Sequence, residues 1–356
     1  MSAPFGPIII RTSDRVTFKR CRRAWKWSSH LHGNLEPKIT ADPLWLGTGV
    51  HFALEDFHGH NWFTKPSAAL LAFASAWRLS KLPLPAEWED NLALGIAIMD
   101  YYSNTWLARC CRDSLQTYWV DNVPQVEVTA RVKLPILGPN GEDVYYQVTF
   151  DRIVEVDGYL WVVEYKTAAS FREGNYQTDQ QTTSYCWLGQ VVYDRPVKGV
   201  FYQQHRKTLP QAPAFSPYKR RFSTAEKQIT SAPLYRDALV TLYGTLNKVP
   251  ADNIEYLNEL QSKETELRDA FVIRERVTRN ESELEHEGSS ILLEVADMID
   301  PNLRIYRNAT QWCNMCSFLY PCIMHDDGSD WEHQLQTLYT TRQEEQSEWR
   351  KHLKWP

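Results

Sequence analysis

The order of hydrophobic and polar residues divides the chain into a helical start, a central run of strands and a helical end. Helical periodicity is clearest in KPSAALLAFASAWRL and NLALGIAIMDYYSNTWLARCC, both before residue 120. Between 125 and 215, runs of β-branched and aromatic residues alternate with turn residues, and VKGVFYQQHRK is expected to be the last strand. Helical periodicity returns from about residue 222. We therefore expect segments 1–124, 125–215 and 216–356 to form one structural unit of the α/β class.

The strongest local signal is a β-hairpin. The runs VTFDRIVEV and YLWVVEYKT are joined by Asp157-Gly158, a two-residue loop typical of tight hairpins. If Val156 pairs with Tyr159, the same register places Asp151 directly opposite Glu164. Lys166 lies two residues further along and shares the face of Glu164.

Two carboxylates that face each other on a sheet repel, and a divalent cation is the simplest way to neutralise them. Replacing Asp151 with asparagine is accordingly expected to stabilise the metal-free protein. The alternative is a solvated strand face on which Lys166 pairs with the acids. The neighbouring residues are apolar on both faces, which favours a covered central strand where idle charges are rare. Two acids and a lysine on one sheet face suit metal-assisted hydrolysis of phosphodiesters.

An Asp followed, after a hairpin, by Glu-x-Lys resembles the core signature of the PD-(D/E)xK nucleases. Two further motifs resemble the RecB-like branch of that superfamily, which includes CRISPR-associated and AddB-type iron–sulfur exonucleases. In WLGTGVHFALEDF, His51 matches the family's metal-binding histidine, and Glu55 one helical turn later is given only a minor role. Gln181 and Tyr185 match its Gln-x-x-x-Tyr motif, with Gln180 as the alternative if the helix is shifted by one residue.

This resemblance implies a restriction-endonuclease-like core, in which a mixed central sheet is flanked by helices. It implies that Mg²⁺ or Mn²⁺ is bound by His51, Asp151, Glu164 and the backbone carbonyl of Tyr165. Lys166 would activate water or stabilise the phosphate in the transition state. Gln181 and Tyr185 would position the DNA backbone near the metal.

The cysteines form a second constellation. Cys313, Cys316 and Cys322 give Cys-x2-Cys-x5-Cys, whereas Cys21 stands almost a whole chain away. They make a four-thiolate site only if the two ends of the chain meet. The resemblance implies a [4Fe–4S] cluster, and zinc is the alternative, although structural zinc sites usually draw their thiols as two local pairs. Cys110, Cys111 and Cys186 are expected to be buried apolar residues.

Charge and composition bear on the expected partner and location of the protein. The net charge is −5, but residues 11–26 are strongly basic, and Arg20, Arg22 and Arg23 are expected to contact DNA. The acidic stretch from Glu281 to Glu287 is expected to be a solvated helix face or loop rather than a DNA contact. The chain has an odd number of cysteines and neither a secretory signal nor a stretch long enough to span a membrane, so a soluble cytoplasmic protein is expected.

Together these features predict a metal-dependent DNA exonuclease that acts on single strands or duplex ends in recombination, repair or phage DNA processing. No helicase motif is present, so a helicase or recombination partner would be another chain. The alternatives are a structure-specific endonuclease, or a catalytically silent DNA-binding subunit with a four-cysteine zinc or iron–sulfur site.

Overall fold

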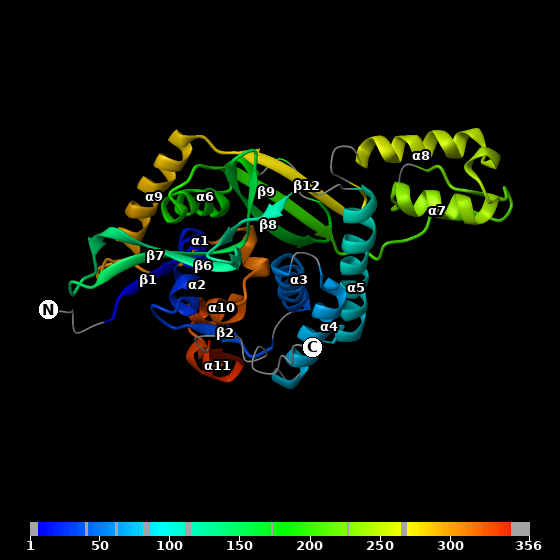
Figure 1. Ribbon diagram of the computed structural model, residues 1–356. Helices are drawn as coiled ribbons and strands as arrows, with labels where there is room; N and C mark the ends of the chain where they lie inside the picture. The colour runs from blue at the N-terminus through cyan, green and yellow to red at the C-terminus, as the bar shows by residue number, and fades with distance from the viewer. Residues whose placement is uncertain are drawn as a thin grey trace.

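The protein is a mixed α/β structure built on one central sheet (Figure 1). The computed structural model describes residues 6–39, 42–60, 63–80, 84, 86–110, 115–171, 174, 176–225, 228–264 and 269–342. The described residues form a seven-stranded sheet with the order β1-β7-β8-β9-β12, and β3 and β6 also pair with β7. These strands are β1 (Ile8–Arg11), β3 (Gln116–Thr117), β6 (Val126–Leu137), β7 (Asp143–Val156), β8 (Tyr159–Ala168), β9 (Val197–Arg206) and β12 (Val272–Thr278).

Strand directions make the sheet mixed. β1 runs parallel to β7, and β8 runs parallel to β9, whereas the other pairs are antiparallel. The parallel pair β8–β9 requires a crossover, which α6 (Gln180–Tyr193) supplies. This mixed sheet flanked by helices confirms the expected fold class.

Three strands of the sheet, β1, β3 and β12, come from outside residues 125–215, the segment expected to hold the sheet. The expectation that VKGVFYQQHRK is the last strand is wrong, because β12 pairs with β9 along its whole length, from Val272 opposite His205 to Thr278 opposite Gly199. The sequence of β12, VIRERVT, has three consecutive charged residues at its centre, Arg274, Glu275 and Arg276, yet Arg274 is buried. β1 is the short apolar run at the start of the chain, and its parallel pairing with β7 depends on a contact across more than 130 residues.

Helices cover both faces of the sheet. On one face, α3 (Asp42–Gly59), α4 (Pro66–Ser80) and α5 (Trp88–Tyr101) build a core with Trp161, Val163 and Tyr165 of β8. On the other face, α1 (Thr12–Arg20), α6 and α9 (Glu281–Ile299) build a second core that includes Leu160 and Val162. The alternation of side chains along β8 therefore separates the two cores.

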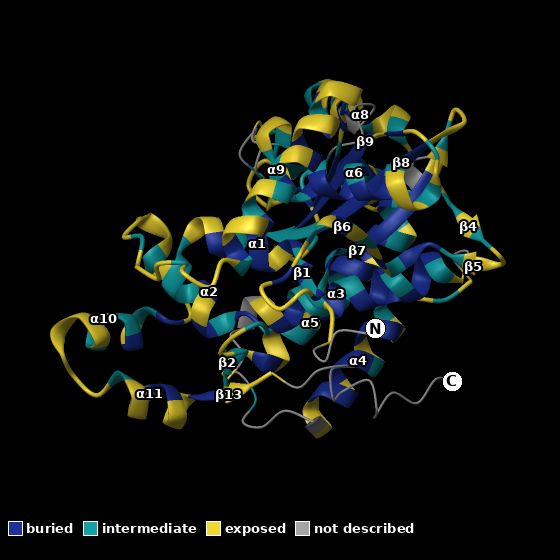
Figure 2. Ribbon diagram, turned by 90° about the vertical axis from the view of Figure 1, so that its left-hand side faces the viewer, coloured by how far each residue is buried: buried dark blue, intermediate teal, exposed yellow. Residues whose placement is uncertain are grey.

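N-terminal and C-terminal elements of the described chain lie together, as Figure 2 shows for α2, β2, α10, α11 and β13. β2 (Leu35–Pro37) pairs antiparallel with β13 (Tyr339–Thr341). Trp27 of α2 (Arg22–Ser28) is buried together with Phe318, Leu335 and Tyr339. The C-terminal elements in this group are the 3-10 turn η4 (Gln311–Met315), α10 (Leu319–Asp327) and α11 (Trp331–Leu338).

A helical pair, α7 (Ala232–Tyr243) and α8 (Ala251–Glu264), projects from one end of the sheet (Figure 1). It has a small core of its own, centred on Tyr235, Leu239 and Leu257. The remaining elements are short: the π-helical segment η1 (Tyr102–Cys110), the 3-10 turns η2 (Tyr176–Thr178) and η3 (Leu246–Lys248), and the hairpins β4 (Trp119–Val120) with β5 (Val123–Pro124) and β10 (Phe215–Ser216) with β11 (Arg221–Phe222). Among the helices described, none is both long enough and apolar enough to cross a membrane.

Candidate active site and cysteine site

Three side chains from separate elements converge beside the β7–β8 hairpin. Nδ1 of His51 on α3 lies 3.3 Å from Oδ1 of Asp151 on β7 and 3.5 Å from Oε1 of Glu127 on β6. The donor atoms of these three residues all lie within 4.8 Å of one another. In the part of the chain that the structure describes, no other histidine, cysteine, aspartate and glutamate side chains meet this spacing in a group of three. Carboxylate oxygens and an imidazole nitrogen at such a spacing can hold one divalent cation.

The predicted register of the hairpin is confirmed as far as Arg152 opposite Val163, whereas the predicted pair of Asp151 and Glu164 lies one residue beyond the strand pairing. Val156 pairs with Tyr159, and the pairing continues in register to Arg152 opposite Val163. One step further, the backbone pairing ends, and Oδ2 of Asp151 accepts the amide hydrogen of Tyr165 at 2.8 Å. Burial alone would raise the pKa of Asp151, but His51 and this hydrogen bond hold it below its usual value. Asp151 is therefore an ionised, fixed carboxylate.

Glu164 is a buried carboxylate of the site that lacks a full set of hydrogen-bond partners. Its side chain is 3% exposed, and Oε1 pairs with Nζ of Lys166. Oε2 is buried and has no hydrogen-bond partner. Burial, followed by the nearby charge of Asp151, raises the pKa of Glu164 to about 7. A buried carboxylate oxygen without a partner is costly, and a divalent cation at this position would remove that cost.

Lys166 lies at the open edge of the site. Its side chain is 44% exposed. Burial lowers the pKa of Lys166, but the ion pair with Glu164 outweighs this effect and raises it above its usual value. The ammonium group is therefore charged and accessible to a phosphate from solvent.

The sequence pattern does not identify Glu127 as a site residue. Val126 pairs with Arg152 and Val128 pairs with Phe150, so Glu127 lies across from Asp151. Its backbone has φ of +51°, a left-handed conformation that is uncommon for a residue with a side chain and that concentrates at functional sites. In VEVTARVKLPIL, Glu127 has the pattern of a solvent-facing position. The register of β6 on β7 would have revealed it, but that register shifts between Lys133 and Leu137 and is not readable from the turn.

His51 carries positive charge when no metal is present. Burial lowers its pKa, but the carboxylates of Asp151 and Glu127 raise it well above its usual value. The imidazolium thus occupies the position where the acidic groups require a cation. Gly49, one half-turn earlier, lets α3 approach α4, since a Cβ there would lie 2.7 Å from a methyl carbon of Leu70. Burial, and to a smaller extent the charges of Asp151 and Glu55, raise the pKa of Glu127 despite its pairing with His51.

The Gln-x-x-x-Tyr pair lies beside the same carboxylates. Nε2 of Gln181 donates to Oη of Tyr185 at 2.8 Å along one face of α6. Asp179 caps this helix through the amide of Gln181, which sets the helical register. Gln180 is turned away and accepts a hydrogen bond from Lys19. Burial and the charge of Glu164 raise the pKa of Tyr185, so its hydroxyl stays protonated.

Much of the basic N-terminal segment is neutralised within the fold. Arg15 is buried and pairs with Glu287 and Glu294 of α9. The expectation that Glu281 to Glu287 is a solvated face is therefore wrong for Glu287, which is 4% exposed. Arg23 pairs with Asp326 at 2.7 Å. Arg20 and Arg22 instead lie over the aromatic rings of Trp312 and Tyr306.

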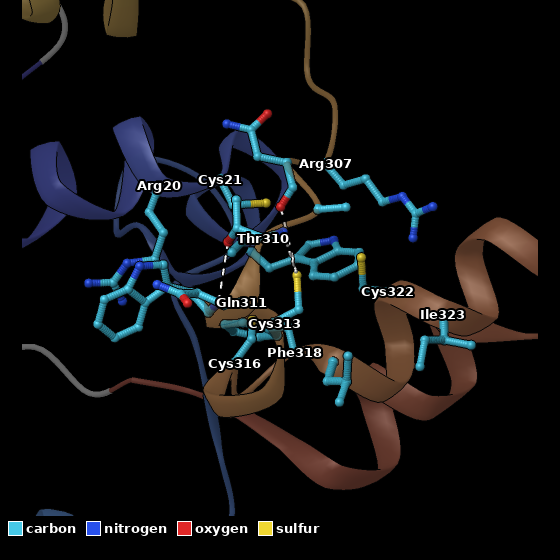
Figure 3. Close-up of a pocket in the computed structure, with 16 residues that line it drawn as sticks. Arg20, Cys21, Arg307, Thr310, Gln311, Cys313, Cys316, Phe318, Cys322 and Ile323 are labelled. Carbon is cyan, nitrogen blue, oxygen red and sulfur yellow. Dashed lines mark hydrogen bonds between the residues drawn. The ribbon is translucent and has the colours of Figure 1, made fainter.

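The four cysteines expected to share a site surround one cavity of about 520 Å³ (Figure 3). Cys21 comes from the junction of α1 and α2, and Cys313, Cys316 and Cys322 come from η4, the residue after it and α10. The amide of Thr310 donates to Sγ of Cys313, and Arg23 donates to Sγ of Cys322, both at 3.4 Å. No three of these sulfurs lie within 4.8 Å of one another. Cys186 is fully buried as expected, while Cys111 and the side chain of Cys110 lie outside the described residues.

Comparison with protein-family models identifies the superfamily of this chain. Residues 13–322 match the model of the PD-(D/E)XK nuclease superfamily, so the chain belongs to that superfamily. A search of curated proteins gave no match. Among solved structures, the chain is similar to one described as "Crystal structure of SSO0001", with 15% identity, 74% of this chain and 78% of that chain covered, and a TM-score of 0.24, which is too low to carry an argument.

Proposed function

We propose that this protein is a divalent-metal-dependent deoxyribonuclease of the exonuclease type, belonging to the RecB-like branch of its superfamily. The observation that carries the proposal is the convergence of His51, Glu127 and Asp151 next to a buried Glu164 oxygen that lacks a partner. Two carboxylates packed this closely around one imidazolium, with the buried Glu164 carboxylate nearby, form a site that would bind a divalent cation.

The donor set fits Mg²⁺ or Mn²⁺, both of which prefer oxygen ligands, with an imidazole as an additional ligand that favours Mn²⁺. Asp151, Glu127 and Glu164 would hold the ion together with His51, which must lose its proton to do so. When bound, the ion supplies Lewis-acid polarisation of the phosphodiester and activates the attacking water.

The other residues of the site act on the DNA. Lys166 stabilises the negative charge that develops on the phosphate, since its ammonium group stays protonated and reaches solvent. Gln181 and the hydroxyl of Tyr185 position the DNA backbone, because they form a hydrogen-bonded pair beside Glu164. The backbone of Tyr165 fixes the orientation of Asp151.

The test is a nuclease assay with end-labelled single-stranded, duplex and closed circular DNA in the presence of Mg²⁺ or Mn²⁺. We expect cleavage of linear DNA from its ends and no cleavage of the circle. Glu164→Ala and Lys166→Ala should abolish cleavage. Glu155→Ala is the matched control, because Glu155 is a partly exposed carboxylate of β7 that pairs with Arg195 outside the site. Cleavage of the circle would indicate an endonuclease, and DNA binding without cleavage would indicate a silent subunit.

We further propose that the four cysteines hold a [4Fe–4S] cluster that joins the two ends of the chain. Support comes from the four thiols around one cavity and from the β2–β13 pairing that holds the ends together. Zinc is the alternative occupant of the four thiols. Iron and zinc analysis with ultraviolet–visible absorption of anaerobically purified protein separates the two metals.

A further inference from the structure

Two arginines of the α1–α2 junction are stacked on aromatic side chains from the segment that precedes α10. The guanidinium of Arg20 lies 4.9 Å from the ring centroid of Trp312, and that of Arg22 lies 5.1 Å from the ring centroid of Tyr306. Trp312 and Tyr306 remain 38% and 48% exposed. Figure 3 shows Arg20 at the edge of the cysteine cavity, which it helps to line. Stacking fixes the rings on the surface and leaves part of each accessible.

This surface retains its positive charge. In the described part of the chain, neither Arg20 nor Arg22 forms an ion pair with a carboxylate, in contrast to Arg15 and Arg23. Exposed aromatic rings next to unpaired guanidinium groups match the way in which single-stranded nucleic acids are bound, because bases stack on the rings and phosphates approach the cations. A duplex, whose bases are already stacked, cannot use the rings.

The surface is connected with the candidate active site. Lys19, adjacent to Arg20, pairs with Glu294 at 3.0 Å and also donates a hydrogen bond to Gln180, which is adjacent to Gln181 of the Gln-x-x-x-Tyr pair. Lys19 therefore links the surface to α6, and the free positive charge of the surface comes from Arg20 and Arg22. We propose that Lys19, Arg20, Arg22, Tyr306 and Trp312 form a track that binds single-stranded DNA, with bases stacked on Tyr306 and Trp312, and leads the strand to the candidate active site. This inference rests on the proposed function and names the form of DNA that the site receives.

Binding is measured by fluorescence anisotropy with a labelled thymidine oligonucleotide and with a duplex of the same length, using the full chain in EDTA so that cleavage plays no part. We expect Tyr306→Ala and Trp312→Ala each to weaken single-strand binding at least about fivefold, as loss of one stacked base predicts. Duplex binding should change little. Tyr306→Phe and Trp312→Phe should retain single-strand binding, because a phenylalanine ring still stacks.

Tyr320→Ala is the matched control and should leave binding unchanged. Tyr320 is 72% exposed on α10, and no arginine in the described chain is stacked on its ring. Trp312 also lines the cysteine cavity, so Tyr306, which does not, provides the cleaner test. Unchanged single-strand binding in Tyr306→Ala, or an equal loss for duplex DNA, would overturn the inference. Because binding is read without metal, a chain that binds through this track but never cleaves would refute only the proposed nuclease activity.

Discussion

Replacing Glu164 with glutamine should stabilise the metal-free protein and abolish cleavage at the same time. The wild-type carboxylate is buried, one of its oxygens has no hydrogen-bond partner, and its pKa is raised from 4.5 to about 7, first by burial and then by Asp151. Glutamine has nearly the same shape and carries no charge. The variant therefore removes the electrostatic cost and also removes a proposed metal ligand.

The size of the effect follows from the pKa. A raised pKa means that the folded protein binds the proton more tightly, so the corresponding stability is present below pH 4.5 and is lost as the pH rises through about 7. At about 1.4 kcal/mol per pKa unit, the ionised side chain costs the metal-free protein on the order of 3 kcal/mol at pH 8. Glutamine loses the ion pair with Lys166, which offsets part of this gain. We expect a net rise of roughly 1–3 kcal/mol in the free energy of unfolding, equivalent to a few degrees in Tm.

The assay is thermal unfolding in EDTA at pH 5 and pH 8. The variant should exceed the wild type at pH 8, and the difference should shrink at pH 5, where the wild-type carboxyl is protonated. Adding Mn²⁺ should stabilise the wild type more than the variant. A variant that is less stable than the wild type at pH 8 in EDTA, or one that still cleaves DNA, would refute this reasoning.

Asp151→Asn is the matched comparison within the same pair. The sequence predicted that this variant would stabilise the metal-free protein. The structure supports the opposite sign, because the pKa of Asp151 is lowered by His51 and by the amide of Tyr165, so the folded state favours the ionised form. Within this pair, the substitution that removes the unfavourable charge is therefore the one at Glu164 and not the one at Asp151.

Three further predictions follow from the same structure. Glu127→Ala should raise the Mn²⁺ concentration for half-maximal cleavage at least about tenfold without lowering Tm in EDTA, and an unchanged midpoint would exclude Glu127 from the metal site. Cys21→Ser should remove the visible absorbance that the proposed iron–sulfur cluster would give and expose the N- and C-terminal segments to proteolysis, whereas Cys186→Ser should do neither. Burial raises the pKa of Asp269 to about 6, so the stability that comes from its protonated form is lost as the pH rises from 4 through 6. The Tm of Asp269→Asn should therefore increase relative to that of the wild type across this pH range. A constant difference in Tm would contradict this prediction.

Predictions from local sequence were reliable where the interacting residues are close in the chain. The Asp157-Gly158 turn sets the register of β7 against β8, because a two-residue loop permits few alternatives. Gln181 and Tyr185 share a helix face because helical geometry places residues i and i+4 together. The same reasoning did not find β12, because its three consecutive charged residues give no strand pattern; the strand forms through its long-range pairing with β9, in which Arg274 is buried.

The sequence by itself determined the local elements, the hairpin with its Asp151 and Glu164, and the residue types needed for metal and thiolate chemistry. Only the tertiary structure decided which distant groups meet. It brought Glu127 against Asp151, paired Glu287 with Arg15, and placed Cys21 at the cavity of the C-terminal cysteines. The physical reason is that hydrogen-bond geometry within a few residues fixes turns and helix faces, whereas contacts between distant segments depend on the packing free energy of the whole chain, which no short pattern encodes.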